Sequence, residues 1–395
     1  MTENASGAST GSTVRFLHTS DWQLGMTRWF LKHDDGEAQA RFSSDRLEAV
    51  RRIGRLAQER GAEFIVVAGD VFESNTLPER DVLRAMDVIR ELPVPVYLLP
   101  GNHDALDATS IYHRDMFTEA EERGVHVLRD SVPVQVRPGV EIVGAPLTSR
   151  VMSEDALAAA LDDLEPTAGV RVAVAHGQVV GFGDEVGATL SVDAVGRAVG
   201  KRLVHYVAVG DSHSTARLDD DGRMWFSGSP ETTDYDDKER DSGNVLLVEV
   251  GPDTAPTVED IAVGAWRFRA MRREFAGAED AERWIEELRL LTDKSRTCVK
   301  YSLSGTLNLS EKGELDRALA ELAPSFAALY QRGSGTDVTV LPEDGDITAL
   351  GLNGFPLDAA ETLRDMANDE AVDAEQRRAA TDALGLLARL VGQGN

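Results

Sequence analysis

Short apolar runs, rich in β-branched residues and separated by polar or glycine-containing turns, follow one another from residue 14 to about residue 250. Runs of this length and composition predict buried β-strands. The predicted strands are 14–17, 64–68, 96–99, 125–128, 134–136, 142–143, 170–175, 204–209, 224–226 and 245–250.

Two amphipathic helices are predicted between the early strands. In 43–60, Leu47, Val50 and Ile53 recur at helical spacing while arginines occupy the other face, and 79–91 repeats the pattern. Helix and strand alternate at first, and strands dominate after about residue 120. The chain is therefore predicted to be an α/β protein with layered, mixed sheets.

The pattern changes after about residue 255. A period-two strand is predicted at 266–270, a helix at 278–292, a strand at 297–303 and a helix at 311–331, which together predict a small α/β unit. The turn-rich stretch 333–346 is interpreted as a linker, and the Ala- and Leu-rich stretch 357–393 as helical. The polar start, 1–12, is predicted to be a disordered tail.

Composition narrows the functional classes. No apolar run approaches the roughly 18 residues of a membrane span, and the start lacks the basic and apolar regions of a secretory signal. The one cysteine, Cys298, cannot form an internal disulfide, which favours a cytoplasmic protein. A net charge of -27 argues against a nucleic-acid partner, unless the basic residues are clustered.

Side chains suited to binding metal follow five of the predicted strands. They are Asp21, Asp70, Asn102 with His103, His176, and Asp211 with His213. In open α/β sheets, ligands bind beyond the carboxyl ends of the strands, so these groups are expected to converge on one site. Carboxylate, amide and imidazole groups are ligands of divalent cations.

The segments that carry these residues resemble a known family. HTSDWQLG (18–25), AGDVFES (68–74), LPGNHD (99–104), AHGQV (175–179) and VGDSH (209–213) are similar to the five motifs of the calcineurin-like metallophosphoesterases, and most similar to those of the SbcD / MRE-eleven DNA repair nucleases. The segment 226–238 resembles the loop after the last motif. The resemblance implies a two-sheet β-sandwich flanked by helices, with a small α/β capping domain and a C-terminal helical segment.

By this resemblance, the domains are a metallophosphoesterase domain at 13–254, a capping domain at 255–335, and a linker with C-terminal helices at 336–395. The resemblance also implies that the site holds two divalent ions, with Mn²⁺ preferred and Mg²⁺ or Fe²⁺ as alternatives. Asp21 and His213 would bind metal one, Asn102 and His176 metal two, and Asp70 both. His103 would act on the phosphate, in a two-metal mechanism.

Two positions depart from the family pattern. Gln23 and Asp211 stand where the family has histidines, beside metal one and metal two respectively. Three alternatives follow: an oxygen-richer site that favours Mn²⁺ or Mg²⁺, a weak metal one that makes the enzyme slow, or a non-catalytic subunit. His18 has the wrong strand parity to replace them, and His33, in the loop after the first motif, could swing inward.

The expected activity is hydrolysis of DNA phosphodiesters, as a double-strand exonuclease and single-strand endonuclease in DNA repair. Candidate DNA-binding residues are Arg28, Trp29 and Lys32 beside the first motif, and Arg267 and Arg269 at the start of the cap. The family implies an SbcC-like ATPase partner at the C-terminal helices, and a homodimer formed through helices around 79–91 and 107–123. A stand-alone phosphodiesterase for small phosphoesters and a non-catalytic DNA-binding subunit remain the alternatives.

Overall fold

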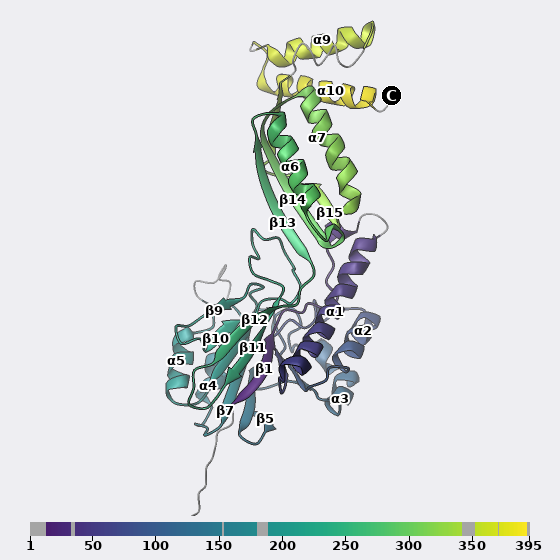
Figure 1. The fold of residues 1–395 in the computed structure, drawn as a ribbon. Coiled ribbons are helices and arrows are strands. Elements are labelled where there is room, and N and C mark those ends of the chain that lie inside the picture. The colour runs from purple at the N-terminus through teal and green to yellow at the C-terminus, as the bar shows by residue number, and fades with distance from the viewer. Residues whose placement is uncertain are drawn as a thin grey trace, which may run out of the picture. The chain divides into compact units, whose positions relative to one another are not determined.

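The protein is described here by a computed structural model, which covers residues 13–32, 36–151, 154–179, 189–341, 352–369 and 371–392. The chain divides into two compact units, Met1–Trp266 and Arg267–Asn395 (Figure 1). The predicted tail at 1–12 and His33 lie outside the described residues.

The first unit contains two six-stranded sheets. The first sheet has the order β12-β11-β1-β2-β3-β4, and its strands are β1 (Val14–Thr19), β2 (Ile65–Val67), β3 (Val96–Leu98), β4 (Val125–Val127), β11 (Asn244–Val250) and β12 (Thr257–Ala262). The second has the order β5-β6-β7-β8-β10-β9, and its strands are β5 (Val134–Arg137), β6 (Val140–Ala145), β7 (Val170–His176), β8 (Tyr206–Gly210), β9 (Ala216–Arg217) and β10 (Met224–Phe226).

The central strands are buried on both faces, which explains their continuous apolar runs. Phe16 on β1 and Val66 on β2 pack against Tyr206 and Val174 of the other sheet. On the outer face of the first sheet lie α1 (Glu37–Arg60), α2 (Glu79–Ile89) and α3 (Asp115–Glu121). The helices α4 (Ala156–Asp162) and α5 (Val192–Gly200) cover the second sheet, so the unit has four layers.

The second unit is a parallel sheet packed against two helices. Its strands are β13 (Arg267–Phe275), β14 (Thr297–Asn308), β15 (Ala328–Gln331) and β16 (Asp337–Leu341), and its helices are α6 (Ala278–Leu290) and α7 (Leu309–Leu322). Trp284 and Leu288 on α6 pack with Leu315 on α7 over the sheet. The C-terminal helices α9 (Phe355–Asn368) and α10 (Ala374–Gly392) join through Ala360 and Leu384.

The predicted fold class is confirmed: the chain is a mixed α/β protein with two packed sheets, flanking helices and a C-terminal helical segment. Three local predictions differ from the structure. The helix expected at 311–331 ends at Leu322, since Pro324 lies in the following 3₁₀ turn and 328–331 is the strand β15.

The stretch 333–346, interpreted as a linker, contains β16, whose residues pair in parallel with β14. The helix expected around 107–123 is only α3, at Asp115–Glu121, preceded by the 3₁₀ turn Ile111–His113. The first unit also continues past residue 254 to Trp266, because β12 pairs with β11 in its sheet.

Among the described helices, none has both the length and the apolar character required to cross a membrane.

Candidate metal centre

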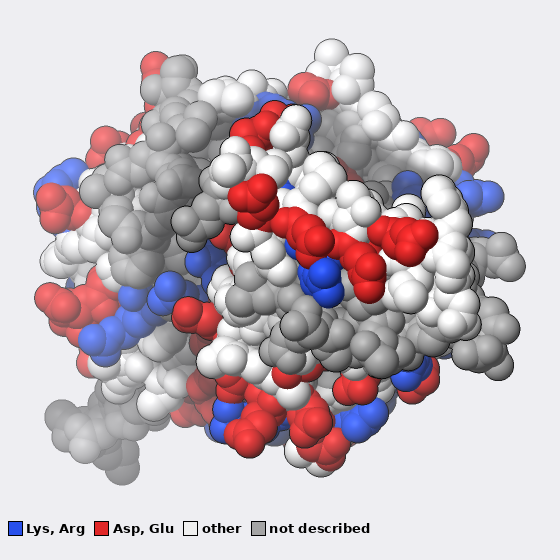
Figure 2. All heavy atoms as spheres, turned by 90° about the horizontal axis from the view of Figure 1, so that it is seen from above, with Lys and Arg blue, Asp and Glu red and all other residues white. Residues whose placement is uncertain are grey.

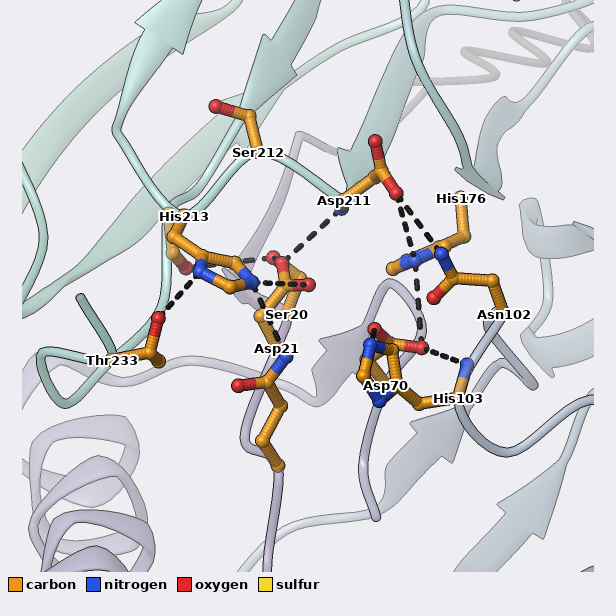
Figure 3. A network of polar contacts seen from close by, with 12 residues as sticks. Ser20, Asp21, Asp70, Asn102, His103, His176, Asp211, Ser212, His213 and Thr233 are labelled. Atoms are coloured by element: carbon orange, nitrogen blue, oxygen red, sulfur yellow. Dashed lines mark hydrogen bonds and ion pairs between the residues drawn. The ribbon is translucent and has the colours of Figure 1, made fainter. Parts of the chain in front are cut away.

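The side chains singled out in the sequence meet where parallel strands of both sheets end. Asp21, Asp70 and Asn102 follow β1, β2 and β3 of the first sheet, and these strands are paired in parallel. His176 is the last residue of β7 and Asp211 follows β8 directly, and these two strands are parallel neighbours in the second sheet. The two sheets therefore supply one cluster from their shared carboxyl-terminal edge (Figure 3).

One side of the cluster is formed by Asp21, Gln23 and His213. The Nε2 atom of His213 lies 3.8 Å from Asp21 Oδ1 and 3.2 Å from Gln23 Nε2. Asp21 and Gln23 are held by the next motif, since their N–H groups donate to the carbonyls of Gly69 (3.0 Å) and Asp70 (2.8 Å). These are the residues expected around metal one.

The other side is formed by Asp70, Asn102, His176 and Asp211. The Nε2 atom of His176 lies 3.5 Å from Asp70 Oδ1 and 3.7 Å from Asp211 Oδ1. Asn102 Nδ2 donates to Asp211 Oδ1 at 3.4 Å. These are the residues expected around metal two, and Asp21, Asp70 and His176 alone offer three ligand atoms within 4.8 Å of one another.

Several buried polar atoms of this cluster have no hydrogen-bond partner among the residues that the structure describes. They are Asp21 Oδ1, Gln23 Oε1, Asn102 Oδ1 and His176 Nε2. Leaving a buried polar atom without a partner costs free energy. Bound divalent cations would provide the missing partners for these four atoms. His176 Nδ1 contacts the Ala68 carbonyl at 2.8 Å, so the ring donates there and Nε2 is the atom that faces the cluster, where it would bind a metal ion once deprotonated. The donor set therefore fits divalent metal ions.

The backbone at the cluster is strained. Asp21, Gln23, Asp70 and Asp211 have φ angles of 52°, 43°, 54° and 100°, whereas only two other non-glycine residues in the described chain have positive φ. Such angles are unfavourable for residues with a Cβ and concentrate at functional sites. The local strain therefore marks the same residues as the side-chain geometry does.

Glycines next to the cluster allow close packing. A Cβ on Gly69 would lie 2.1 Å from His176 Nδ1, and one on Gly210 would lie 1.9 Å from the Ala68 carbonyl oxygen. The Gly-Asp pairs at 69–70 and 210–211 are thus required because the motif loops touch one another.

Charge is concentrated in the cluster. Burial raises the pKa of Asp21 to about 6 and also raises the pKa of Asp211. Burial by itself lowers the pKa of His176, but the charges of Asp70, Asp21 and Asp211 outweigh burial and raise this pKa to about 9. Without metal, the protonated His176 imidazole therefore balances part of the charge of the buried carboxylates, and metal binding must displace its proton.

His103 lies at the open side of the cluster. Its Nδ1 contacts the Glu73 carbonyl at 3.0 Å, which directs Nε2 toward the cluster, 3.9 Å from Asp70 Oδ2. Its backbone N–H donates to Asp70 Oδ1 at 2.9 Å. The ring has an exposed side-chain fraction of 27%, so it can meet a substrate from solvent.

Other predicted residues have different surroundings. His18 is buried between the sheets, where its Nδ1 lies 3.0 Å from the Tyr206 hydroxyl.

The candidate DNA-binding residues differ in their contacts. Arg28 donates to the backbone carbonyl of Thr233, so its guanidinium is bound to a neighbouring loop of the protein. Trp29 has an exposed fraction of 66%, and Lys32 is exposed. Arg267 and Arg269 begin β13 of the second unit, and their DNA-binding role stays a prediction there.

Sequence reasoning missed the residues that support the cluster. Asp104 is fully buried and accepts from the N–H groups of Gly101 (2.7 Å) and Phe72 (3.0 Å) and from the Tyr112 hydroxyl (2.6 Å). Glu239 lies behind His213. The position of Asp104 in Gly-Asn-His-Asp was a usable signal, whereas nothing distinguishes Glu239 from the acidic residues around it.

Known proteins are similar to parts of this chain. The family model for calcineurin-like phosphoesterases matches residues 14–215. The DNA double-strand break repair protein Mre11 of Archaeoglobus fulgidus is 29% identical over 104 residues, which cover 25% of this chain and 22% of that protein. The Mre11 protein of Methanococcus maripaludis is 29% identical over 94 residues, 23% of each chain.

The chain therefore spans less than a quarter of the length of these curated relatives. Among solved structures, TT1561 of Thermus thermophilus is similar with a TM-score of 0.39 and 14% identity, over 64% of this chain and all of that one.

Proposed function

Because this chain belongs to the calcineurin-like phosphoesterase family, we propose that it is a metal-dependent phosphodiesterase that hydrolyses DNA in DNA repair. The observation that carries the proposal is the set of unpartnered buried oxygen and nitrogen atoms at the shared edge of the two sheets. The similarity of about a quarter of the chain to two proteins named for DNA double-strand break repair supports DNA as the substrate.

The proposed metal centre uses this chain's own residues in two groups. Asp21, Gln23 and His213 would hold one divalent ion and Asn102, His176 and Asp211 the other, while Asp70 would contact both. Two divalent ions, when bound, neutralise phosphate charge and lower the pKa of water. The oxygen-rich set favours Mn²⁺ or Mg²⁺ over softer ions.

His103 would act directly on the substrate. The hydrogen bond between Nδ1 and the Glu73 carbonyl leaves Nε2 as the ring atom that faces the cluster. From that position Nε2 can hold a proton at a phosphate oxygen or supply it to the leaving oxygen. We assign His103 as the catalytic residue on this basis.

DNA would approach along the loop after the first motif. Trp29 and Lys32, three residues apart in the chain, are both exposed, so an aromatic ring and a cation would meet a base and a phosphate there. Acidic and basic side chains occur side by side over the face drawn in Figure 2. Residues 1–266 contain 45 acidic and 25 basic side chains, so most of the net charge of -27 lies in the first unit, and DNA binding there would depend on local cations such as Lys32.

We further propose that α9 and α10 bind an SbcC-like ATPase. Phe355, Met366 and Leu386 are 83%, 38% and 53% exposed on these helices, although α9 and α10 already bury Ala360 and Leu384 between them. Contiguous patches of exposed apolar side chains mark protein interaction sites, and the proposal requires that these three belong to one such patch. A homodimer through α2 and α3 is proposed by family resemblance, and Leu83 on α2 is 42% exposed.

The deciding experiment is a Mn²⁺ titration of hydrolysis on a linear duplex, a single-stranded circle and a chromogenic diester, with and without the ATPase. We expect Mn²⁺-dependent cleavage of both DNA substrates. Activity on the small diester alone would refute the DNA assignment and identify a stand-alone phosphodiesterase. Absence of activity together with absence of metal binding would identify a non-catalytic subunit. Asp70→Asn is the control that separates a contaminating nuclease from the chain's own activity.

A further inference from the structure

A buried carboxylate lies behind His213, on the side of the ring opposite Asp21. Glu239 is 5% exposed, and its Oε2 atom lies 3.3 Å from His213 Nδ1. Between them stands Thr233, whose Oγ1 atom is 2.5 Å from His213 Nδ1 and 2.6 Å from Glu239 Oε2. Figure 3 shows the Thr233 hydroxyl against this edge of the ring.

The directions of these hydrogen bonds follow from the donors around Glu239. The N–H of Thr233 donates to Oε1 at 3.0 Å, and the N–H of Asp234 donates to Oε2 at 2.9 Å. A carboxylate in this setting only accepts, so the Thr233 hydroxyl hydrogen points to Glu239 and its oxygen accepts from His213 Nδ1–H. The lone pair of His213 is then on Nε2, the atom 3.8 Å from Asp21 Oδ1.

We propose that Glu239, acting through Thr233, is a positioning residue that fixes the tautomer and orientation of His213 for binding a divalent ion. The inference rests on the proposed metal centre. A carboxylate behind a ligating imidazole orients the ring and raises its basicity. This support matters here because Gln23, on the same side, offers only a neutral amide, which leaves His213 as the one imidazole described there.

A second buried glutamate in the same loop provides a matched control. Glu231 is 1% exposed, pairs with Arg52 at 2.7 Å, and accepts from the N–H groups of Ala265 (2.9 Å) and Trp266 (3.0 Å). It therefore anchors the loop in the same way as Glu239 does, but its partners lie away from His213.

The experiment compares the full-length wild type with Glu239→Gln, Thr233→Val and Glu231→Gln. Mn²⁺ binding is measured by calorimetry, and the state of the bound metal by electron paramagnetic resonance. We expect the wild type to bind two Mn²⁺ as a spin-coupled pair. Glu239→Gln should bind one Mn²⁺ with unchanged affinity and the second about 10- to 100-fold more weakly, with a spectrum of isolated Mn²⁺.

Thr233→Val should shift the second affinity in the same direction, and it serves as the test if Glu239→Gln does not fold. Glu231→Gln should bind both ions as the wild type does. Two dissociation constants within twofold of wild type in both Glu239→Gln and Thr233→Val would overturn the inference, as would equal loss in Glu231→Gln. A wild type that does not bind two ions would overturn the proposed metal centre itself, so the two failures are distinguishable.

Discussion

The Asp211 carboxylate reaches across the junction of the two sheets to Asn102, whose Nδ2 donates to Oδ1 at 3.4 Å. Asp211 follows β8 of the second sheet, and Asn102 follows β3 of the first. The same Asp211 oxygen lies 3.7 Å from His176 Nε2. The carboxylate that stands where the family has a histidine is therefore aimed at the same point as its neighbours, which favours an altered metal site over a degenerate one.

Asp70 is predicted to be indispensable for metal binding, because its carboxylate is the one proposed to contact both ions. Asp70→Asn keeps the shape of the side chain and removes its charge. Mn²⁺ at 100 times its dissociation constant should stabilise the wild type by about 2.7 kcal/mol for each of the two sites and leave Asp70→Asn nearly unchanged. Thermal unfolding with Mn²⁺ and with a chelator measures the difference, and equal stabilisation of both proteins would contradict the assignment.

His103 is predicted to serve the reaction without holding metal. His103→Ala should bind Mn²⁺ within twofold of the wild type, since none of the proposed ligand atoms is removed. Its rate of diester hydrolysis should fall by about 10²- to 10⁴-fold, the usual contribution of a general acid or base. Rates are to be measured at saturating Mn²⁺, together with calorimetric binding. An unchanged rate would remove His103 from the reaction, and lost binding would make it a ligand.

The site residues that could be predicted from sequence are those at strand ends. Asp21, Asp70, His176 and Asp211 were recognisable because an apolar strand precedes each of them, and that pattern is local. Their convergence also followed, since parallel strands end at one edge of a sheet. The identity of the metal and the contacts to DNA involve the metal ions and the DNA themselves, which the sequence does not describe, so both stay predictions.

Features that depend on tertiary contacts were not recognisable. Glu239 reaches His213 through a loop whose several acidic residues look alike in sequence. Residues 337–341 contain the strand-favouring Val338, Thr339 and Val340, but glycine-rich and acidic stretches flank them in the sequence, and the strand is recognisable only from its parallel pairing with β14. Arg28 was a candidate for binding phosphate, yet it donates to Thr233, and this contact follows only from the folded loop.

The pH dependence of hydrolysis should reflect the presence of Gln23 and Asp211 at the two positions where the family has histidines. In this chain Asp21, Asp70 and Asp211 would offset three of the four positive charges of two divalent ions, which leaves the site a net charge of +1. A site with only two aspartates would keep a net charge of +2. A less positive site lowers the pKa of water less, so we expect a more alkaline optimum than in relatives with both histidines. Gln23→His with Asp211→His should move the optimum of hydrolysis to lower pH. A profile that does not move would refute this explanation.

His18 is predicted to limit stability in acid. Complete burial lowers its pKa to about 3 from 6.5, so the folded protein keeps the ring neutral while the unfolded chain protonates it below pH 6.5. A lowered folded-state pKa contributes stability that is present above pH 6.5 and is lost progressively as the pH falls toward 3. Between pH 7.5 and pH 5 this loss amounts to about 2 kcal/mol.

His18→Gln should remove that part of the acid dependence, because an amide does not titrate and can still accept from the Tyr206 hydroxyl, which lies 3.0 Å from the His18 ring. Urea unfolding at pH 7.5 and pH 5 measures the free energy of unfolding of both proteins. The difference between the two pH values should be about 2 kcal/mol smaller in the variant than in the wild type. His113→Gln, at an exposed position, controls for the loss of a histidine and should keep the wild-type dependence. If His18→Gln also keeps it, then protonation of His18 does not drive unfolding, and other buried groups at the junction of the two sheets must carry the acid sensitivity.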